Sequence, residues 1–195
     1  MEHLHLKPTR LDAAVARTIA HKTSPTIEHI MKFGTWLADE RLLYAGSALL
    51  WLASRRQSPR RRAQADHFLL AATAANLIPH LVKHVVDRQR PDRRYKARRN
   101  GIPKSGRAYD SFPSGHAMHV GVVASAASWM QPKTTAWVWA GGTLLATTRV
   151  ALLAHWVSDV AVGLVAGAAL ERALRPVSAQ LFGAPEECDD RGGRR

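Results

Sequence analysis

The stretch FPSGHAMHVGVVASAASWM, residues 112–130, carries no formal charge and contains a helix-start signal near its beginning. Ser114 is a preferred N-cap residue, because its hydroxyl can accept a hydrogen bond from a free amide of the first turn. The apolar and small residues that follow show little period-two alternation, which favours an α-helix over a strand. The stretch therefore predicts an apolar helix whose first turn contains His116.

Further apolar segments lie on both sides of this helix, and alanine, leucine and tryptophan dominate them. They are Leu42–Ala53, His67–Val86, Thr134–Ala154 and Trp156–Leu170. Gly163 and Gly167 form a small-xxx-small pair, which allows two helices to approach closely. We therefore predict an all-α fold, a bundle of about five helices preceded by one or more amphipathic helices within residues 1–41.

The hydropathy of these segments leaves two environments open. A membrane span needs about 20 predominantly apolar residues, and polar residues interrupt each segment. Mean hydropathy is −0.19, although two arginine-rich stretches at residues 54–62 and 88–107 account for much of that low value. The alternative to a membrane bundle is a soluble bundle of five or six helices. We expect five membrane-spanning helices and a multi-pass protein of the cell membrane.

The composition restricts the partners and the chemistry. A formal net charge of +13 and a pI of about 11.0 predict an anionic partner, such as phosphate, anionic lipid or nucleic acid. The single cysteine, Cys188, provides neither a disulfide framework nor a thiolate metal cluster, and the chain has no H-E-x-x-H motif. We therefore expect no metal and no cofactor. Residues 1–176 are predicted to form one domain, and residues 177–195 a polar, flexible tail.

The N-terminal sequence MEHLHLKPTR contains no apolar signal-peptide core. Export of a soluble product is therefore not expected. The arginine runs lack the interleaved aromatic residues that single-strand nucleic-acid binding uses, so no nucleic-acid partner is expected either.

Three polar patches occur where apolar segments meet polar loops. In the first, Lys83 precedes Arg90 by seven residues, so the two side chains would share one face of a helix that Pro91 ends. In the second, Ser114 and Gly115 open a helix whose free amides and dipole favour a bound anion near His116. A basic segment at a membrane surface and a plain helix cap are the simpler interpretations of these two patches.

The third patch is TRVALLAHWVSD, residues 148–159. His155 and Asp159 are four residues apart and share one face of a helix, so Asp159 can accept a hydrogen bond from one imidazole nitrogen and leave the other nucleophilic. Arg149 and Asp159 interrupt apolar segments, where ionisable groups are costly and commonly functional. A buried ion pair between Arg149 and Asp159 is the structural alternative.

The order and spacing of the three patches resemble the signature of the type-2 phosphatidic acid phosphatase superfamily, which also contains class A acid phosphatases and vanadium haloperoxidases. The family pattern is K-x6-R-P, P-S-G-H and S-R-x5-H-x3-D. This chain has KHVVDRQRP at 83–91, PSGH at 113–116 and TRVALLAHWVSD at 148–159. Thr148 replaces the family serine and keeps a hydroxyl group.

The resemblance implies a metal-independent phosphatase with a phosphohistidine intermediate. His155 would be the nucleophile, Asp159 would orient it, and His116 would protonate the leaving oxygen and then activate water. The phosphoryl oxygens would be held by a set of cations, a hydroxyl and an amide, namely Lys83, Arg90, Arg149, Ser114 and Gly115. Three fixed cations could supply the charge neutralisation that phosphoryl transfer requires.

The predicted substrate is a lipid phosphate, with phosphatidic acid, phosphatidylglycerol phosphate and polyprenyl diphosphate all open. Most other basic residues of the 88–107 loop are interpreted as a surface that faces solvent or lipid headgroups. The positive-inside rule does not decide the orientation, because basic runs occur on both sides. Similar bacterial lipid phosphatases mostly face outward, and we expect the same. The alternatives are a soluble acid phosphatase and a non-enzymatic basic helical protein that binds anionic lipid.

Overall fold

The computed structural model describes residues 3–22, 31, 33, 40–95 and 106–183, and these residues are mostly helical, as predicted. The five predicted helical segments are all present. They form α3 (Glu40–Ser54), α4 (Pro59–Val82), α6 (Gly115–Met130), α7 (Thr135–Ala151) and α8 (Val157–Phe182). Shorter elements are α1 (Arg10–Lys22), α5 (Pro91–Tyr95), the 3₁₀ turn η2 (Pro132–Thr134), β1 (Leu4–His5) and β2 (Val86–Asp87).

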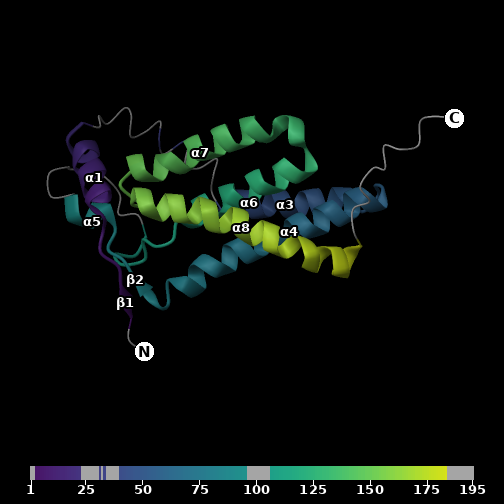
Figure 1. Ribbon diagram of the computed structural model, residues 1–195, viewed down its shortest axis with the longest axis horizontal. Coiled ribbons are helices and arrows are strands. Elements are labelled where there is room, and N and C mark those ends of the chain that lie inside the picture. Colours follow the sequence, from purple (N-terminus) through teal and green to yellow (C-terminus); the bar gives the residue numbers. More distant parts are fainter. Residues whose placement is uncertain (1–2, 23–30, 32, 34–39, 96–105, 184–195) are drawn as a thin grey trace.

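The five long helices run roughly along one axis, and α1, α5 and the two short strands gather at one end of this bundle (Figure 1). Helix α6 packs against α4, α7 and α8, whereas α3 packs chiefly against α4. Buried hydrophobic side chains fill the core between these helices, including Ala71, Ala75, Met118 and Val122. Because α4 ends, α6 begins and α8 begins at the same end, the polar segments next to these helix ends lie close together (Figure 1).

Glycines bring α6 and α8 into backbone contact, as the small-xxx-small pair predicts. A Cβ atom at Gly163 would lie 2.7 Å from the carbonyl oxygen of Ser114, and one at Gly167 would lie 2.0 Å from that of Met118. A Cβ atom at Gly121 would lie 2.2 Å from the carbonyl oxygen of Leu164. No larger residue fits at these positions without separating the helices, so the glycines set the spacing between α6 and α8.

The segment after α4 differs from the predicted helix over Lys83 to Arg90. Helix α4 ends at Val82, a turn follows, and β2 then pairs in parallel with the N-terminal β1. Pro91 does not end a helix but begins α5. At the first position of a helix the amide has no partner within the helix, so the missing amide hydrogen of proline costs nothing. The helical-face argument for Lys83 and Arg90 was therefore wrong, because pairing with the N-terminal strand replaces the helix.

The predicted boundary at residue 176 falls inside α8, which continues through Pro176 to Phe182. Ser178 is buried, and its hydroxyl lies 2.7 Å from Nδ1 of His67 in α4, so this part of the segment belongs to the bundle. The rest of the predicted tail, from residue 184, lies outside the described residues.

Within the part of the chain that the structure describes, no helix combines the length and the hydropathy of a membrane span. The five membrane-spanning helices stay a prediction. Apolar α6 and α7 have 16 and 17 residues, which is short of the roughly 20 that a span needs. The longer α4 and α8 carry charged residues, among them Asp66 and Glu171.

Candidate active site

The start of α6 forms the predicted helix cap. The hydroxyl of Ser114 accepts a hydrogen bond from the amide of Ala117 at 3.4 Å, and Ser114 is fully buried. The amide of Ser114 donates to the backbone carbonyl of Asp159 at 3.3 Å, which joins the start of α6 to the first turn of α8. The PSGH and HWVSD motifs are therefore adjacent in space.

His155 lies in the loop between α7 and α8, not on a helix. The amides of Ala154 and His155 both donate to the carbonyl oxygen of Arg149, at 2.9 and 3.2 Å. Leu153 is buried and has a φ of 55°. Residues other than glycine rarely adopt this left-handed backbone conformation. The loop is thus a strained turn that its surroundings must hold in place.

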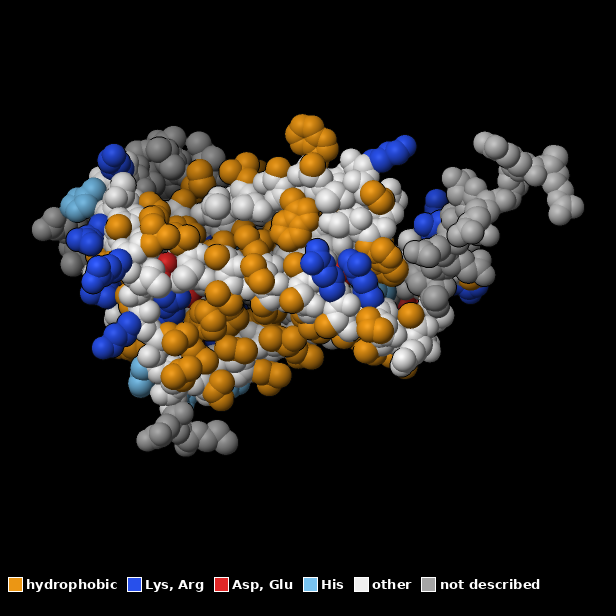
Figure 2. All heavy atoms as spheres, in the orientation of Figure 1, with side chains coloured by type: hydrophobic (Ala, Val, Ile, Leu, Met, Phe, Trp, Pro, Cys, Tyr) orange, Lys and Arg blue, Asp and Glu red, His pale blue; other side chains and the backbone are white. Residues whose placement is uncertain are grey.

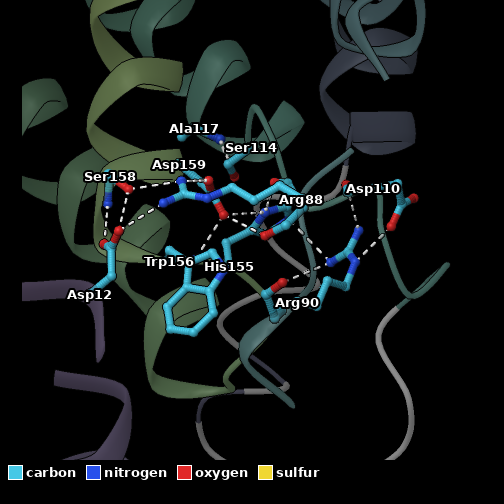
Figure 3. Close-up of polar contacts among 12 residues, drawn as sticks. Asp12, Arg88, Arg90, Asp110, Ser114, Ala117, His155, Trp156, Ser158 and Asp159 are labelled. Atoms are coloured by element: carbon cyan, nitrogen blue, oxygen red, sulfur yellow. Dashed lines mark hydrogen bonds and ion pairs between the residues drawn. The ribbon is translucent and has the colours of Figure 1, made fainter. Parts of the chain in front are cut away.

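The imidazole of His155 is buried and oriented by a backbone carbonyl (Figure 3). Its Nδ1 donates to the carbonyl oxygen of Ser111 at 2.6 Å, so the lone pair lies on Nε2. Nδ1 is 3.8 Å from Oδ2 of Asp159, which is too long for a hydrogen bond. The predicted direct hydrogen bond from His155 to Asp159 is therefore absent, because His155 precedes α8 and faces the 110–111 loop.

Arg90 lies beside Nε2 of His155. Its Nη1 is 3.4 Å from Nε2 and donates to the carbonyl of Ala154 at 2.8 Å, while its Nε donates to Oδ1 of Asp110 at 2.8 Å. Burial tends to raise the pKa of Asp110, but the hydrogen bond and charge of Arg90, with the charge of Lys83, hold that pKa below its usual value. Asp110 thus balances part of the positive charge around His155.

Asp159 is completely buried and accepts three hydrogen bonds. Its Oδ1 accepts from Nη1 of Arg88, and its Oδ2 accepts from the hydroxyl of Ser111 and from the amide of Trp156 (Figure 3). Ser111 is also the residue whose carbonyl holds His155. Ser111 therefore links Asp159 to His155.

Sequence reasoning did not identify Arg88, Ser111, Asp110 or Asp12 as parts of this site. Arg88 belongs to a loop of nine lysines and arginines that we interpreted mainly as a surface, yet it is only 4% exposed. Nη2 of Arg88 forms an ion pair of 2.8 Å with Asp12 of α1. The only available signal was the position of Arg88 between Lys83 and Arg90, within the first motif.

His116, Arg149 and Lys83 also converge on this end of the bundle. Burial lowers the pKa of His116 to about 3, with further lowering by the charges of Arg149, His155 and Lys83. Burial likewise lowers the pKa of His155 to about 4, against the effect of Asp159 and with the help of Arg90 and Arg149. The two histidines and three cations of the predicted site therefore share one electrostatic environment.

Acid is expected to destabilise the folded protein through His155 and His116. Both pKa values lie below the ordinary 6.5, so the unfolded chain binds protons that the folded chain excludes as the pH falls from about 6.5 towards 4. His155 alone would contribute a loss on the order of 3 kcal/mol across that window. The thermal unfolding midpoint at a series of pH values measures the effect.

The matched variant for this measurement is His155→Gln, which removes one of the two groups. Its unfolding midpoint should fall less steeply between pH 6.5 and 4 than that of the wild type. If the unfolding midpoints of the two proteins fell equally with pH, this result would contradict a His155 that is buried and neutral.

A polar cavity of about 750 Å³ lies next to the C-terminal end of α4. Its lining includes Lys83, Arg107, Tyr109 and Asp110. Among the residues that the structure describes, no group of three or more His, Cys, Asp or Glu side chains is placed to hold a metal ion. Of the predicted site residues, Lys83 lines this cavity, whereas His116 and His155 are not among its lining residues.

Residues 65–181 match the PAP2 superfamily, and the chain belongs to this superfamily. The lipid A 1-phosphatase of Rhizobium johnstonii is 30% identical over 163 residues, which is 76% of this chain and 67% of that relative. The lipid A 1-phosphatase of Rhizobium etli is 36% identical over 95 residues, which is 48% of this chain and 41% of that relative. The chain is accordingly a phosphatase, a phosphoric monoester hydrolase.

Two solved structures resemble the fold. Aquifex aeolicus LpxE superposes with a TM-score of 0.69 at 17% identity, covering 91% of this chain and 99% of that one. A transmembrane PAP2-type phosphatidylglycerolphosphate phosphatase from Bacillus subtilis gives a TM-score of 0.62 at 20% identity, covering 87% and 85%. At these identities the likeness concerns the helical fold alone.

Proposed function

We propose that this phosphatase removes a phosphate group from a lipid through a phosphohistidine on Nε2 of His155. The observation that carries the proposal is the 2.6 Å hydrogen bond from Nδ1 of His155 to Ser111, which leaves the lone pair on the nitrogen beside Arg90. Nε2 would attack phosphorus as the bond to the leaving oxygen breaks. Water would then attack the phosphohistidine, release phosphate and restore the imidazole.

The cations and the start of α6 would stabilise the phosphoryl group. Lys83, Arg90 and Arg149 would neutralise charge on its oxygens, and the hydroxyl of Ser114 and the amide of Gly115 would donate to them. The buried Asp159 would stabilise the positive charge that develops on His155 when it forms the new bond. These five binding residues and the three catalytic ones, His155, His116 and Asp159, are the site that we propose.

His116 would protonate the leaving oxygen in the first step and activate water in the second. Burial and nearby cations keep it neutral in the empty site, with a pKa of about 3. A bound phosphate brings at least one negative charge, and an opposite charge within about 4–6 Å raises the pKa of an imidazole. Substrate binding would therefore raise the pKa of His116 and protonate it, and the leaving oxygen would receive this proton.

Two surfaces support an amphiphilic substrate. An apolar cavity of about 640 Å³ between α7 and α8 is lined by Thr148, next to Arg149, and by Val160, next to Asp159. Hydrophobic side chains cover much of the bundle flank, and lysines and arginines gather at the end with α1 and α5, with others on the opposite half of the bundle (Figure 2). Exposed large hydrophobic residues of α4, α7 and α8 include Leu77, Leu81, Trp137, Leu144, Val165 and Leu181. A lipid could place its phosphate at the basic end and its chains along the flank.

We infer from these surfaces and from the relatives that the enzyme works at a membrane. Multi-pass insertion and an outward-facing site stay predictions. The names of the two Rhizobium relatives make a 1-phosphorylated lipid A the first substrate to test, ahead of phosphatidic acid, phosphatidylglycerol phosphate and polyprenyl diphosphate.

Phosphate release from a panel of lipid and soluble phosphates tests this proposal. We expect turnover of at least one lipid phosphate at a kcat/KM above that of p-nitrophenyl phosphate. Orthovanadate should inhibit in competition with substrate, because it adopts the trigonal-bipyramidal geometry of the phosphoryl state. EDTA should leave activity unchanged, since protein cations provide the charge neutralisation.

A strict requirement for Mg²⁺ would contradict the proposed role of Lys83, Arg90 and Arg149. Preference for soluble phosphates over every lipid phosphate would instead favour an acid phosphatase on this fold. The absence of phosphate release from any substrate, with the protein folded, would overturn the proposed function as a whole.

A further inference from the structure

The N-terminal residues lie outside the stretch that matches the superfamily, yet they contact the centre of the site. We propose that Asp12 and Arg88 are positioning residues, which hold Asp159 and the His155 loop in their reactive arrangement. Helix α1 is then a component of the active site and not an appendage. This inference rests on the proposed function, in which His155 is the nucleophile.

Asp12 joins two helices and an arginine. In α1 it forms a reciprocal capping pair with Thr9: the amide of Thr9 donates to Oδ2 at 3.0 Å, and the amide of Asp12 donates to the threonine hydroxyl at 3.1 Å. At α8, the amide and the hydroxyl of Ser158 donate to Asp12 at 3.0 and 2.7 Å. One carboxylate therefore caps the starts of both α1 and α8.

The carboxylate of Asp12 is 1% exposed and ionised. Burial tends to raise its pKa, but hydrogen bonds from Ser158 and Thr9 outweigh that effect and hold the pKa below its usual value. A negative charge at the N-terminus of α8 also interacts favourably with the helix dipole. Asp12 thus provides a fixed anion at the base of the helix that carries Asp159.

Arg88 lies between Asp12 and Asp159 and pairs with both (Figure 3). Its Nη1 also donates to the hydroxyl of Ser158 at 2.8 Å, and its carbonyl accepts from the amide of Ser111 at 3.1 Å. Ser111 in turn bonds both Asp159 and His155. A continuous chain of contacts therefore runs from Asp12 through Arg88 and Ser111 to the imidazole.

Helix α1 also covers the strained loop. Ala16, Ile19 and Ala20 of α1 pack against Leu153 and Trp156, the residues that flank the His155 turn. The indole Nε1 of Trp156 donates to the carbonyl of Gln89 at 2.7 Å, next to Arg88 and Arg90. A residue at a φ of 55° keeps that conformation only where its surroundings impose it, and α1 provides part of those surroundings.

Asp12→Asn tests the proposal, because the amide has the shape of the carboxylate but cannot pair with Arg88 as an anion. We expect kcat to fall about 100-fold, the loss that a displacement of about 1 Å in the reacting groups can cause. KM should stay within about twofold of the wild-type value, since Asp12 does not line the proposed phosphate site. The rate is expressed per site titrated with orthovanadate, so that inactive protein does not count.

The matched control is Asp66→Asn. Asp66 also pairs with an arginine, Arg55, at 2.8 Å, but it lies near the start of α4, away from Lys83 and the site. The kcat of Asp66→Asn per titrated site should equal that of the wild type.

Ser158→Ala is the second test, for use if Asp12→Asn does not fold. It should lower kcat several-fold at unchanged KM, and Ser158→Thr should recover part of the loss.

A role in folding alone would lower the unfolding midpoint and the number of titratable sites, but leave kcat per site at the wild-type value. A wild-type kcat per site in Asp12→Asn overturns the proposal. If Asp12→Asn does not fold, a wild-type kcat per site in Ser158→Ala overturns it instead. The two hypotheses fail differently: if the wild type itself releases no phosphate, the proposed function fails, whereas wild-type turnover with unaffected variants removes only the positioning role.

Discussion

Replacing His155 with alanine is expected to lower kcat by about 10⁴-fold or more, because the phosphohistidine can no longer form. His155 is buried, with Nδ1 held by the carbonyl of Ser111 and Nε2 beside Arg90. Phosphate release from the best lipid substrate measures kcat. Quenching the wild type during turnover with alkaline detergent should trap a phosphorylated protein that is stable in alkali and labile in acid, and His155→Ala should give none.

His21→Ala is the matched control, since His21 is exposed in the last turn of α1 and has no place in the proposed site. It should keep wild-type activity. An unfolding midpoint for His155→Ala close to that of the wild type would show that the loss is chemical. Turnover at the wild-type rate in folded His155→Ala would eliminate this residue as the nucleophile.

Replacing His116 with alanine is expected to separate the two chemical steps. Loss of a general acid or base costs about 10²- to 10⁴-fold, and a lipid alkoxide cannot leave readily without a proton. p-Nitrophenolate is a good leaving group and needs little protonation. His116→Ala should therefore release close to one equivalent of p-nitrophenol per site in a burst and then turn over very slowly, because the water step lacks its base.

Rapid-mixing measurements of p-nitrophenol absorbance test this expectation, and phosphorylated protein should accumulate after the burst. With a lipid phosphate, the same variant should show neither burst nor turnover. A proportionate loss on both substrates, without accumulation of phosphorylated protein, would be incompatible with His116 as the acid and base.

Much of the arrangement could be predicted from the spacing of polar residues at the ends of apolar segments. The five helices, the N-cap at Ser114 and the close contact at Gly163 and Gly167 follow local rules of propensity, capping and residue size. If successive long helices are antiparallel, the C-terminal end of α4 and the start of α6 lie at the same end of the bundle. Lys83 and His116 therefore had to lie at that end. Local rules are strong where a helix is long and its neighbours are sequential.

The remaining parts of the site depend on contacts between distant segments, which no local pattern encodes. Arg88 resembles eight other basic residues of its loop, and only its burial against Asp12 and Asp159 distinguishes it. The carbonyl of Ser111 holds His155, and backbone groups carry no residue-specific signal. The strand pairing that replaced the predicted helix at Lys83 required a partner some 80 residues earlier in the chain.

The backbone contact between α6 and α8 restricts how this scaffold can acquire a new headgroup preference. At Gly121, Gly163 and Gly167 no side chain separates the two helices, so their spacing cannot be tuned by exchanging large residues for small ones. Mutant libraries aimed at different headgroups should leave these glycines intact. Diversity is better placed at the exposed side chains of Arg107 and Tyr109, which line the polar cavity, because the backbone of this loop accepts hydrogen bonds from Arg88 and Arg90.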